Sequence, residues 1–162
     1  MEKYILFAEV EDNPGVVSRI SGFFTRRGYN IESFVTSKTE KKEITLLTFA
    51  VQSSAEEIEL LVHQMKRIED VISVINASAS GTSVVTREFM LIKISCPQEK
   101  NLEIMQVCQM LDIKILGREK DAVTIEAVGS SRKLDDIVLI FKPYGIEKIV
   151  RSGPVCVAQI QE

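Results

Sequence analysis

The sequence predicts an α+β protein of two tandem ferredoxin-like βαββαβ domains, each an antiparallel four-stranded sheet with two helices on one face. Within 162 residues, strand and helix periodicities return twice in the same order. A small, polar, glycine-containing stretch separates the two halves. We therefore expect one domain at 1–77, a linker at 78–85 and a second domain at 86–162.

The first half opens with an apolar strand over 3–10, followed by a turn and a helix. In the turn, Asp12-Asn13-Pro14-Gly15, a capping-type residue precedes a proline suited to the first helical turn. The helix ends near Gly28 and carries a stripe at helical spacing, namely Val17, Ile20, Phe23, Phe24 and Arg27.

Two strands, 30–37 and 43–52, follow around the charged turn 38–42, and the second has an apolar face at period two. The box Ser54-Ala55-Glu56-Glu57 caps the next helix. That helix has the apolar stripe Ile58, Leu61, Val62, Met65 and Ile68, and a strand over 71–77 closes the unit. A second copy of the chain is the simplest cover for the sheet face opposite the helices.

The second half repeats this order. We expect strands at 87–95, 113–117, 122–128 and 146–152, helices at 101–111 and 131–141, and a short edge strand at 155–159. The inward-facing residues of the last helix are Leu134, Ile137, Val138 and Phe141.

Composition excludes several classes of protein. The net charge of −3 and pI of about 5.4 disfavour a nucleic-acid partner, which requires a basic face. No apolar run approaches the roughly 20 residues that span a bilayer, and the first residues lack the layout of a signal peptide. The three cysteines, Cys96, Cys108 and Cys156, imply no disulfide framework, so we expect a reduced cytoplasmic protein.

Catalytic machinery is sparse. The sole histidine, His63, lies on a helix, where a surface or half-buried role is more common than catalysis. Neither paired metal ligands nor a phosphate-binding glycine loop occurs. We expect no catalytic residue and no metal site.

One pair of segments has the features of a small-ligand site: Asp12 to Val17, which joins a strand to a helix, and Asn30, which opens the next strand. Amides at a helix start suit a carboxylate, Gly15 permits close approach to the backbone, and Asp12 could take an ammonium group. Asn30 offers both donors and acceptors. The same residues also fit a capped helix after a tight turn, and the sequence physics leaves both interpretations open.

These segments resemble a known family. Residues 11–19 (EDNPGVVSR) and 26–33 (RRGYNIES) are similar to the ACT domain of acetolactate synthase (acetohydroxyacid synthase) small subunits. In the second half, Arg87-Glu88 and residues 91–94, 124–126, 133–135 and 151–153 resemble the family's C-terminal domain. The resemblance covers essentially the whole chain.

The resemblance implies a non-catalytic regulatory subunit in branched-chain amino acid biosynthesis. It would bind no cofactor itself, activate a catalytic large subunit that carries thiamine diphosphate, magnesium and FAD, and confer feedback inhibition by valine. The resemblance also implies a homodimer through ACT domains that holds valine between chains. One chain would contribute Asp12, Asn13, Pro14, Gly15, Val16 and Val17, and the other Asn30 and Ile31.

Three departures from the family pattern bear on valine affinity. Many members have asparagine at Asp12, arginine at Leu46, and arginine-glycine at Gln159-Ile160. Two other proteins with this strand order, an RNA-recognition motif and an acylphosphatase-like hydrolase, are disfavoured by the 6% aromatic content and the acidic loop. An ACT-domain sensor of another amino acid with a different partner stays open, because one methylene changes affinity by only about 1–3 kcal/mol.

Overall fold

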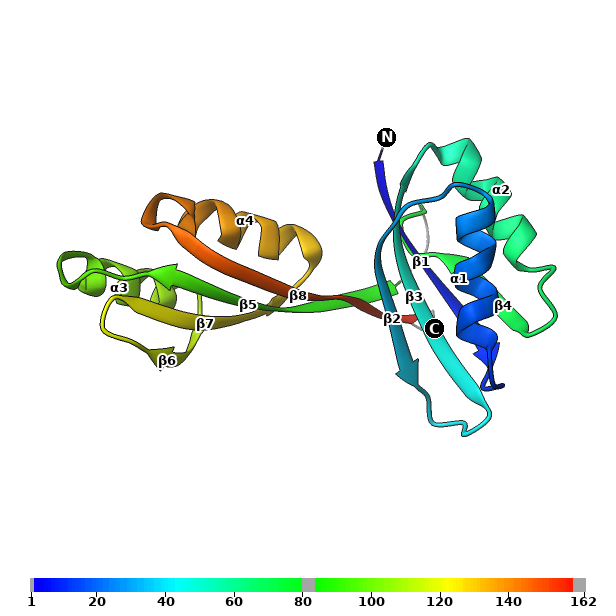
Figure 1. Ribbon diagram of the computed structural model, residues 1–162, viewed down its shortest axis with the longest axis horizontal. Coiled ribbons are helices and arrows are strands. Elements are labelled where there is room, and N and C mark those ends of the chain that lie inside the picture. Colours follow the sequence, from blue (N-terminus) through cyan, green and yellow to red (C-terminus); the bar gives the residue numbers. More distant parts are fainter. Residues whose placement is uncertain (1, 80–83, 159–162) are drawn as a thin grey trace. The chain divides into compact units, whose positions relative to one another are not determined.

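The computed structural model describes residues 2–79 and 84–158. It contains two antiparallel four-stranded sheets, ordered β2-β3-β1-β4 and β6-β7-β5-β8 (Figure 1). This confirms the predicted α+β fold of two tandem ferredoxin-like βαββαβ domains. The chain forms two compact units, one of residues up to 86 together with those from 153 onward, and one of residues 87–152. The segment from 153 to 158, expected in the second domain, therefore belongs to the first unit.

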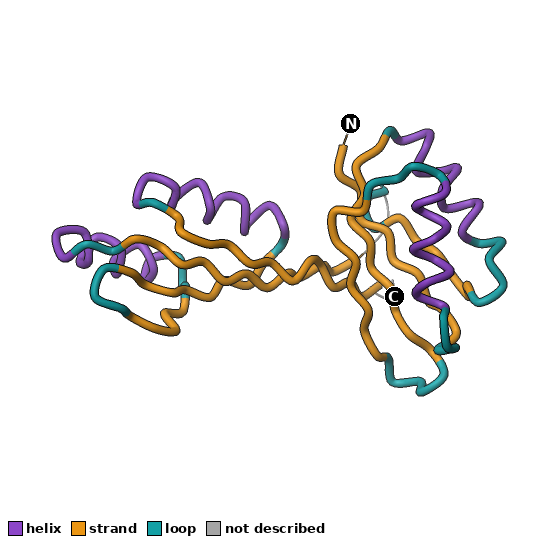
Figure 2. Tube along the Cα trace, in the orientation of Figure 1, coloured by secondary structure: helices purple, strands orange, loops and turns teal. Residues whose placement is uncertain are grey.

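The elements follow the predicted order in both halves (Figure 2). The first unit contains β1 (Glu2–Glu11), α1 (Val16–Arg26), β2 (Ile31–Lys38), β3 (Ile44–Ser53), α2 (Ala55–Met65) and β4 (Val71–Asn76). The later elements are β5 (Val84–Ser95), α3 (Asn101–Met110), β6 (Lys114–Arg118), β7 (Ala122–Gly129), α4 (Ser131–Phe141) and β8 (Ile146–Ala158). Short 3₁₀ turns occur at Gln98–Lys100 and Lys142–Tyr144.

The first core lies between one sheet face and helices α1 and α2. Alternate residues of β1 and β3 point to this face, and the apolar stripes of both helices cover it. Phe49 is fully buried at the centre, with ring centroids 4.9 Å from both Phe24 and Phe34. The residues that share this core include Leu6, Val10, Ile20, Leu47, Val51, Ile58, Leu61 and Met65.

The second core has the same construction and includes one buried ion pair. Its apolar residues include Met90, Ile92, Ile94, Ile104, Val123, Ile125, Leu134, Ile137 and Phe141. At its border the buried Glu88 carboxylate pairs with the Arg151 guanidinium at 2.8 Å and accepts a hydrogen bond from Ser131 at 2.9 Å. These contacts satisfy the buried charge and tie the first turn of α4 to β5 and β8.

Both helices of the first unit have glycine or serine caps, but only one was predicted. The Ser54 capping box is confirmed, because its side chain accepts from the Glu57 amide and Glu57 bonds back to the Ser54 amide. The predicted start of α1 was wrong. The helix begins at Val16, its N-cap is Gly15 at φ 86°, and Pro14 lies in the preceding turn. Glycine adopts this left-handed conformation without the steric cost of a side chain.

The final strand is one continuous element rather than the two predicted strands. Its end lies on the face of the first sheet opposite the helices, where Gly153 packs so closely that an added Cβ would be 2.9 Å from Ser33 Cβ. Cys156 is 2% exposed and forms a hydrogen bond with Thr48. The chain itself therefore covers part of the face for which a second copy was expected.

Two further features noted in the sequence, the linker and the Gln159-Ile160 departure, lie partly or wholly outside the described residues. Strand β5 begins at Val84, before the predicted start at Arg87, so it includes the end of the predicted linker. Residues 80–83 of that linker and the Gln159-Ile160 departure lie outside the described part of the chain. In the described part, no helix has the length and apolar character needed to cross a membrane.

Candidate functional site

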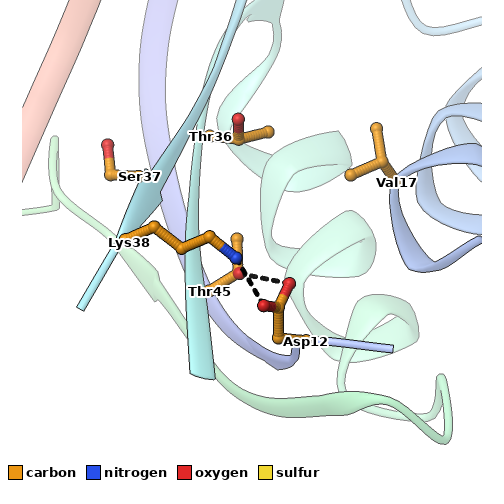
Figure 3. A pocket seen from close by; sticks show the side chains of 6 residues that line it. All are labelled: Asp12, Val17, Thr36, Ser37, Lys38 and Thr45. Atoms are coloured by element: carbon orange, nitrogen blue, oxygen red, sulfur yellow. Dashed lines mark hydrogen bonds and ion pairs between the residues drawn. The ribbon is translucent and has the colours of Figure 1, made fainter. Parts of the chain in front are cut away.

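A hollow of about 140 Å³ lies where the ends of β1 and β2 meet the start of β3 (Figure 3). Both β1 and β2 pair antiparallel with β3, with Glu11 opposite Ile44 and Lys38 opposite Thr45. The topology therefore brings the residue that follows β1 beside the last residue of β2. The hollow is lined by Asp12, Val17, Thr36, Ser37, Lys38 and Thr45.

Asp12 is the charged centre of this hollow. One carboxylate oxygen accepts a hydrogen bond from Thr45 Oγ1 at 2.9 Å, and the other accepts from Lys38 Nζ (Figure 3). Its backbone N–H donates to the Glu43 carbonyl at 2.8 Å. The Lys38 hydrogen bond, followed by the Thr45 hydrogen bond, lowers the pKa of the Asp12 carboxyl below its ordinary value. Asp12 is therefore held as a carboxylate in a fixed position.

The rest of the predicted loop shapes the turn. The Asn13 amide donates to Glu11 at 2.9 Å and to Asp70 at 3.3 Å, and Asp70 pairs with Arg19 at 3.0 Å. Pro14 and Gly15 are exposed, whereas the Val16 side chain is buried in the core. Of the six predicted loop residues, the structure places Asp12 and Val17 on the hollow. The other four support the turn at the start of α1.

The predicted partner residues lie at the opposite end of α1. Asn30 is exposed and lines a separate hollow of about 330 Å³ with Arg27, Gly28, Tyr29, Gln52, Ser53 and Glu57. Ile31 is half-buried and packs against the first core. Helix α1 has 11 residues, which corresponds to a length of about 16 Å. One chain therefore does not bring Asn30 and Asp12 together.

Sequence reasoning missed four residues of the hollow: Thr36, Ser37, Lys38 and Thr45. The sequence predicts Lys38 to lie in a charged turn, but it is the last residue of β2 and points at Asp12 (Figure 3). The strand register that pairs Lys38 with Thr45 is what places Lys38 on the hollow. That pairing depends on the geometry of the connecting turn, which composition and periodicity do not fix.

Comparisons with known proteins agree over both halves. Residues 6–73 match the family model of the AHAS small subunit-like ACT domain, and residues 87–160 match that of the small subunit of acetolactate synthase. The acetolactate synthase small subunit of Mycolicibacterium smegmatis is 32% identical over 150 residues, which cover 93% of this chain and 87% of the relative. That of Bacillus subtilis is 32% identical over 158 residues, covering 97% and 91%.

A solved structure gives the same result for the fold. The acetolactate synthase small subunit from Thermotoga maritima superposes with a TM-score of 0.84 at 25% identity and covers 100% of both chains. The similarity to these proteins thus extends over both units.

Proposed function

This chain belongs to the acetolactate synthase small-subunit family, and from that premise we propose that it activates a catalytic large subunit and makes that subunit sensitive to valine. In this proposal the chain carries out no chemistry itself. Thiamine diphosphate, magnesium and FAD belong to the catalytic partner, which makes acetolactate from pyruvate.

The hollow beside Asp12 has the groups that a small amino acid requires. Helix α1 contributes Val17 to the hollow, and backbone amides in a first helical turn lack intrahelical acceptors and suit a carboxylate, although the Val16 amide already donates to the Asn13 carbonyl at 3.2 Å. The Asp12 carboxylate suits an ammonium group, and Val17, with 39% of its surface exposed, offers apolar contact to a short aliphatic side chain. These features support an amino acid as the effector.

In this proposal, two copies of the chain pair through their β2 edges, and Asn30 of the partner subunit completes the site. Strand β2 is at the edge of its sheet, and among the described residues β3 is its one paired neighbour. Two copies that pair antiparallel along this edge about a twofold axis place the start of one β2 beside the end of the other. Asn30 of the partner subunit then lies near Lys38 and the hollow.

The observation that carries the proposal is the position of two residues at opposite ends of one edge strand: Lys38, which lines the hollow, ends β2, and Asn30 immediately precedes its start. Valine bound across this interface would favour the arrangement of the dimer that activates poorly. A coupling of about 1–3 kcal/mol between effector and activation corresponds to roughly 5- to 150-fold control.

Reconstitution tests this function. The chain is mixed with its catalytic subunit, and acetolactate formation from pyruvate is measured with and without valine, leucine or isoleucine. We expect the chain to raise the rate and valine to lower it. An unchanged rate would refute activation, and inhibition by leucine or isoleucine alone would identify a different effector.

A further inference from the structure

We propose that Lys38 binds the carboxylate of the effector, and that Asp12 and Lys38 together select a ligand that carries both a carboxylate and an ammonium group. This inference rests on the proposed function and adds Lys38 to the same site. The competing explanation is that Lys38 merely forms a surface ion pair that fastens the end of β2.

Both charged groups retain bonding capacity after they have bound each other. The Lys38 ammonium has three donors, and the ion pair with Asp12 uses one of them. The Asp12 carboxylate has about four lone-pair sites, and its bonds to Lys38 and Thr45 use two. An amino acid can therefore place its carboxylate on Lys38 and its ammonium on Asp12 without breaking the pair.

Lys38 is more exposed than Asp12, and this difference suits a ligand site. The Lys38 side chain is 76% exposed and that of Asp12 34% exposed, so their ion pair adds little to folding stability. Thr45 is buried at 5% exposure and holds the other oxygen of Asp12. The anionic group is thus fixed from below, while the cationic group remains accessible at the rim of the hollow.

The edge pairing of the proposed dimer adds to this argument. If the twofold axis of that dimer passes through the middle of β2, Lys38 at one end of the strand would lie opposite Ile31 of the partner subunit and beside Asn30 of the partner subunit. Lys38 would then occupy the place where the two parts of the proposed site meet. A partner subunit at that edge would shield a ligand beside Lys38 from bulk water, and lower local polarity strengthens charge-assisted hydrogen bonds.

Isothermal titration calorimetry of the full chain with three ligands of one carbon skeleton tests the inference. Valine carries both charges, valinamide lacks the carboxylate, and α-ketoisovalerate lacks the ammonium group. We expect the wild-type chain to bind valine about tenfold or more tightly than either analogue, the effect of one lost charge-assisted hydrogen bond.

Matched variants test whether Lys38 and Asp12 cause this preference for valine. Lys38→Met should weaken valine binding about tenfold and reduce the preference for valine over valinamide. Lys38→Arg keeps the charge and should retain most of the affinity. Lys42→Met removes an exposed lysine of the neighbouring turn, outside the lining of the hollow, and should change nothing. Asp12→Asn keeps an acceptor for Thr45 and should reduce discrimination against α-ketoisovalerate.

The outcomes separate this inference from the function on which it rests. Wild-type valine binding together with unchanged affinity and selectivity in Lys38→Met would overturn the role of Lys38 and leave the proposed function standing. No binding of any branched-chain amino acid by the wild-type chain would overturn both. Equal loss of all three ligands in Lys38→Met and Lys38→Arg would mean that Lys38 acts only by packing.

Discussion

At the scale of single residues, the environment of Asp12 shows how a surface carboxylate is held in a fixed position. Lys38 and Thr45 approach it from β2 and β3, so its position depends on two strands and on the turn that joins them. The carboxylate was predicted as an ammonium-binding group from the sequence. Its two neighbours were not, because cross-strand register decides which side chains meet.

The lowered pKa of Asp12 predicts a specific titration. The midpoint of its carboxyl signal, followed by NMR, should lie below the ordinary value of 3.8. Because the folded-state pKa is depressed, the stabilising contacts of Asp12 are present above the unfolded pKa and are lost as pH falls through the folded pKa. Lys38→Met should move the midpoint back toward 3.8. A wild-type midpoint at or above that value would contradict the contacts described.

Substitution of Gly15 by aspartate or by asparagine tests the effect of a negative charge, because the two side chains have nearly the same shape. Its φ of 86° is left-handed, and a Cβ added there meets no atom within 4 Å. Asparagine and aspartate tolerate this conformation better than other side chains. Gly15→Asp should abolish valine binding in calorimetry, because it adds a negative charge beside the effector carboxylate. Gly15→Asn should bind valine far better. Equal affinities of the two variants for valine would show that the ligand carboxylate does not lie near this turn.

At the scale of helices and strands, most of the fold could be predicted because its signals are local. The stripe Ile58, Leu61 and Met65 is buried as predicted, and helix α4 has the predicted bounds of 131–141. The start of α1 could not be predicted, since Asn13-Pro14 and Gly15 both offer plausible cap positions. The continuous β8 was missed because Gly153 resembles a strand terminator in sequence.

The capping box of α2 should contribute measurably to stability. Ser54→Ala removes the acceptor of the Glu57 amide and should lower the free energy of unfolding by about 1 kcal/mol in chemical denaturation. Ser18→Ala, an exposed position within α1, serves as the control and should have a much smaller effect. Equal effects of the two substitutions would argue against the cap.

Gly153 provides a test of the contact between the end of β8 and β2. Gly153→Ala should destabilise the protein by about 1–3 kcal/mol, because its φ is 80° and the new Cβ would lie 2.9 Å from Ser33 Cβ and Val35 Cγ2. Gly117→Ala is the matched control, since nothing lies within 4 Å of a Cβ there. Thermal melts of both variants measure this difference in stability. An unchanged melting temperature of Gly153→Ala would show that the end of β8 does not pack closely against β2.

At the scale of the whole molecule, the proposed effector site is one that no single chain completes. The resemblance to the family predicted this division between chains, with Asp12 to Val17 on one side and Asn30 with Ile31 on the other. Within one chain the structure separates Asp12 from Asn30 by the length of α1. The edge position of β2 then supplies a simple way for two copies to bring them together.

Subunit mixing tests this claim most directly. As homodimers, a Gly15→Asp chain should lose valine binding and an Asn30→Ala chain should bind valine weakly, but every mixed dimer combines one intact loop with one intact Asn30. After equal amounts are unfolded and refolded together, half of the dimers are mixed, and calorimetry should recover about one quarter of the wild-type valine sites per chain. If the mixture binds no more valine than the two separate variants, the effector site lies within a single chain and the account is wrong.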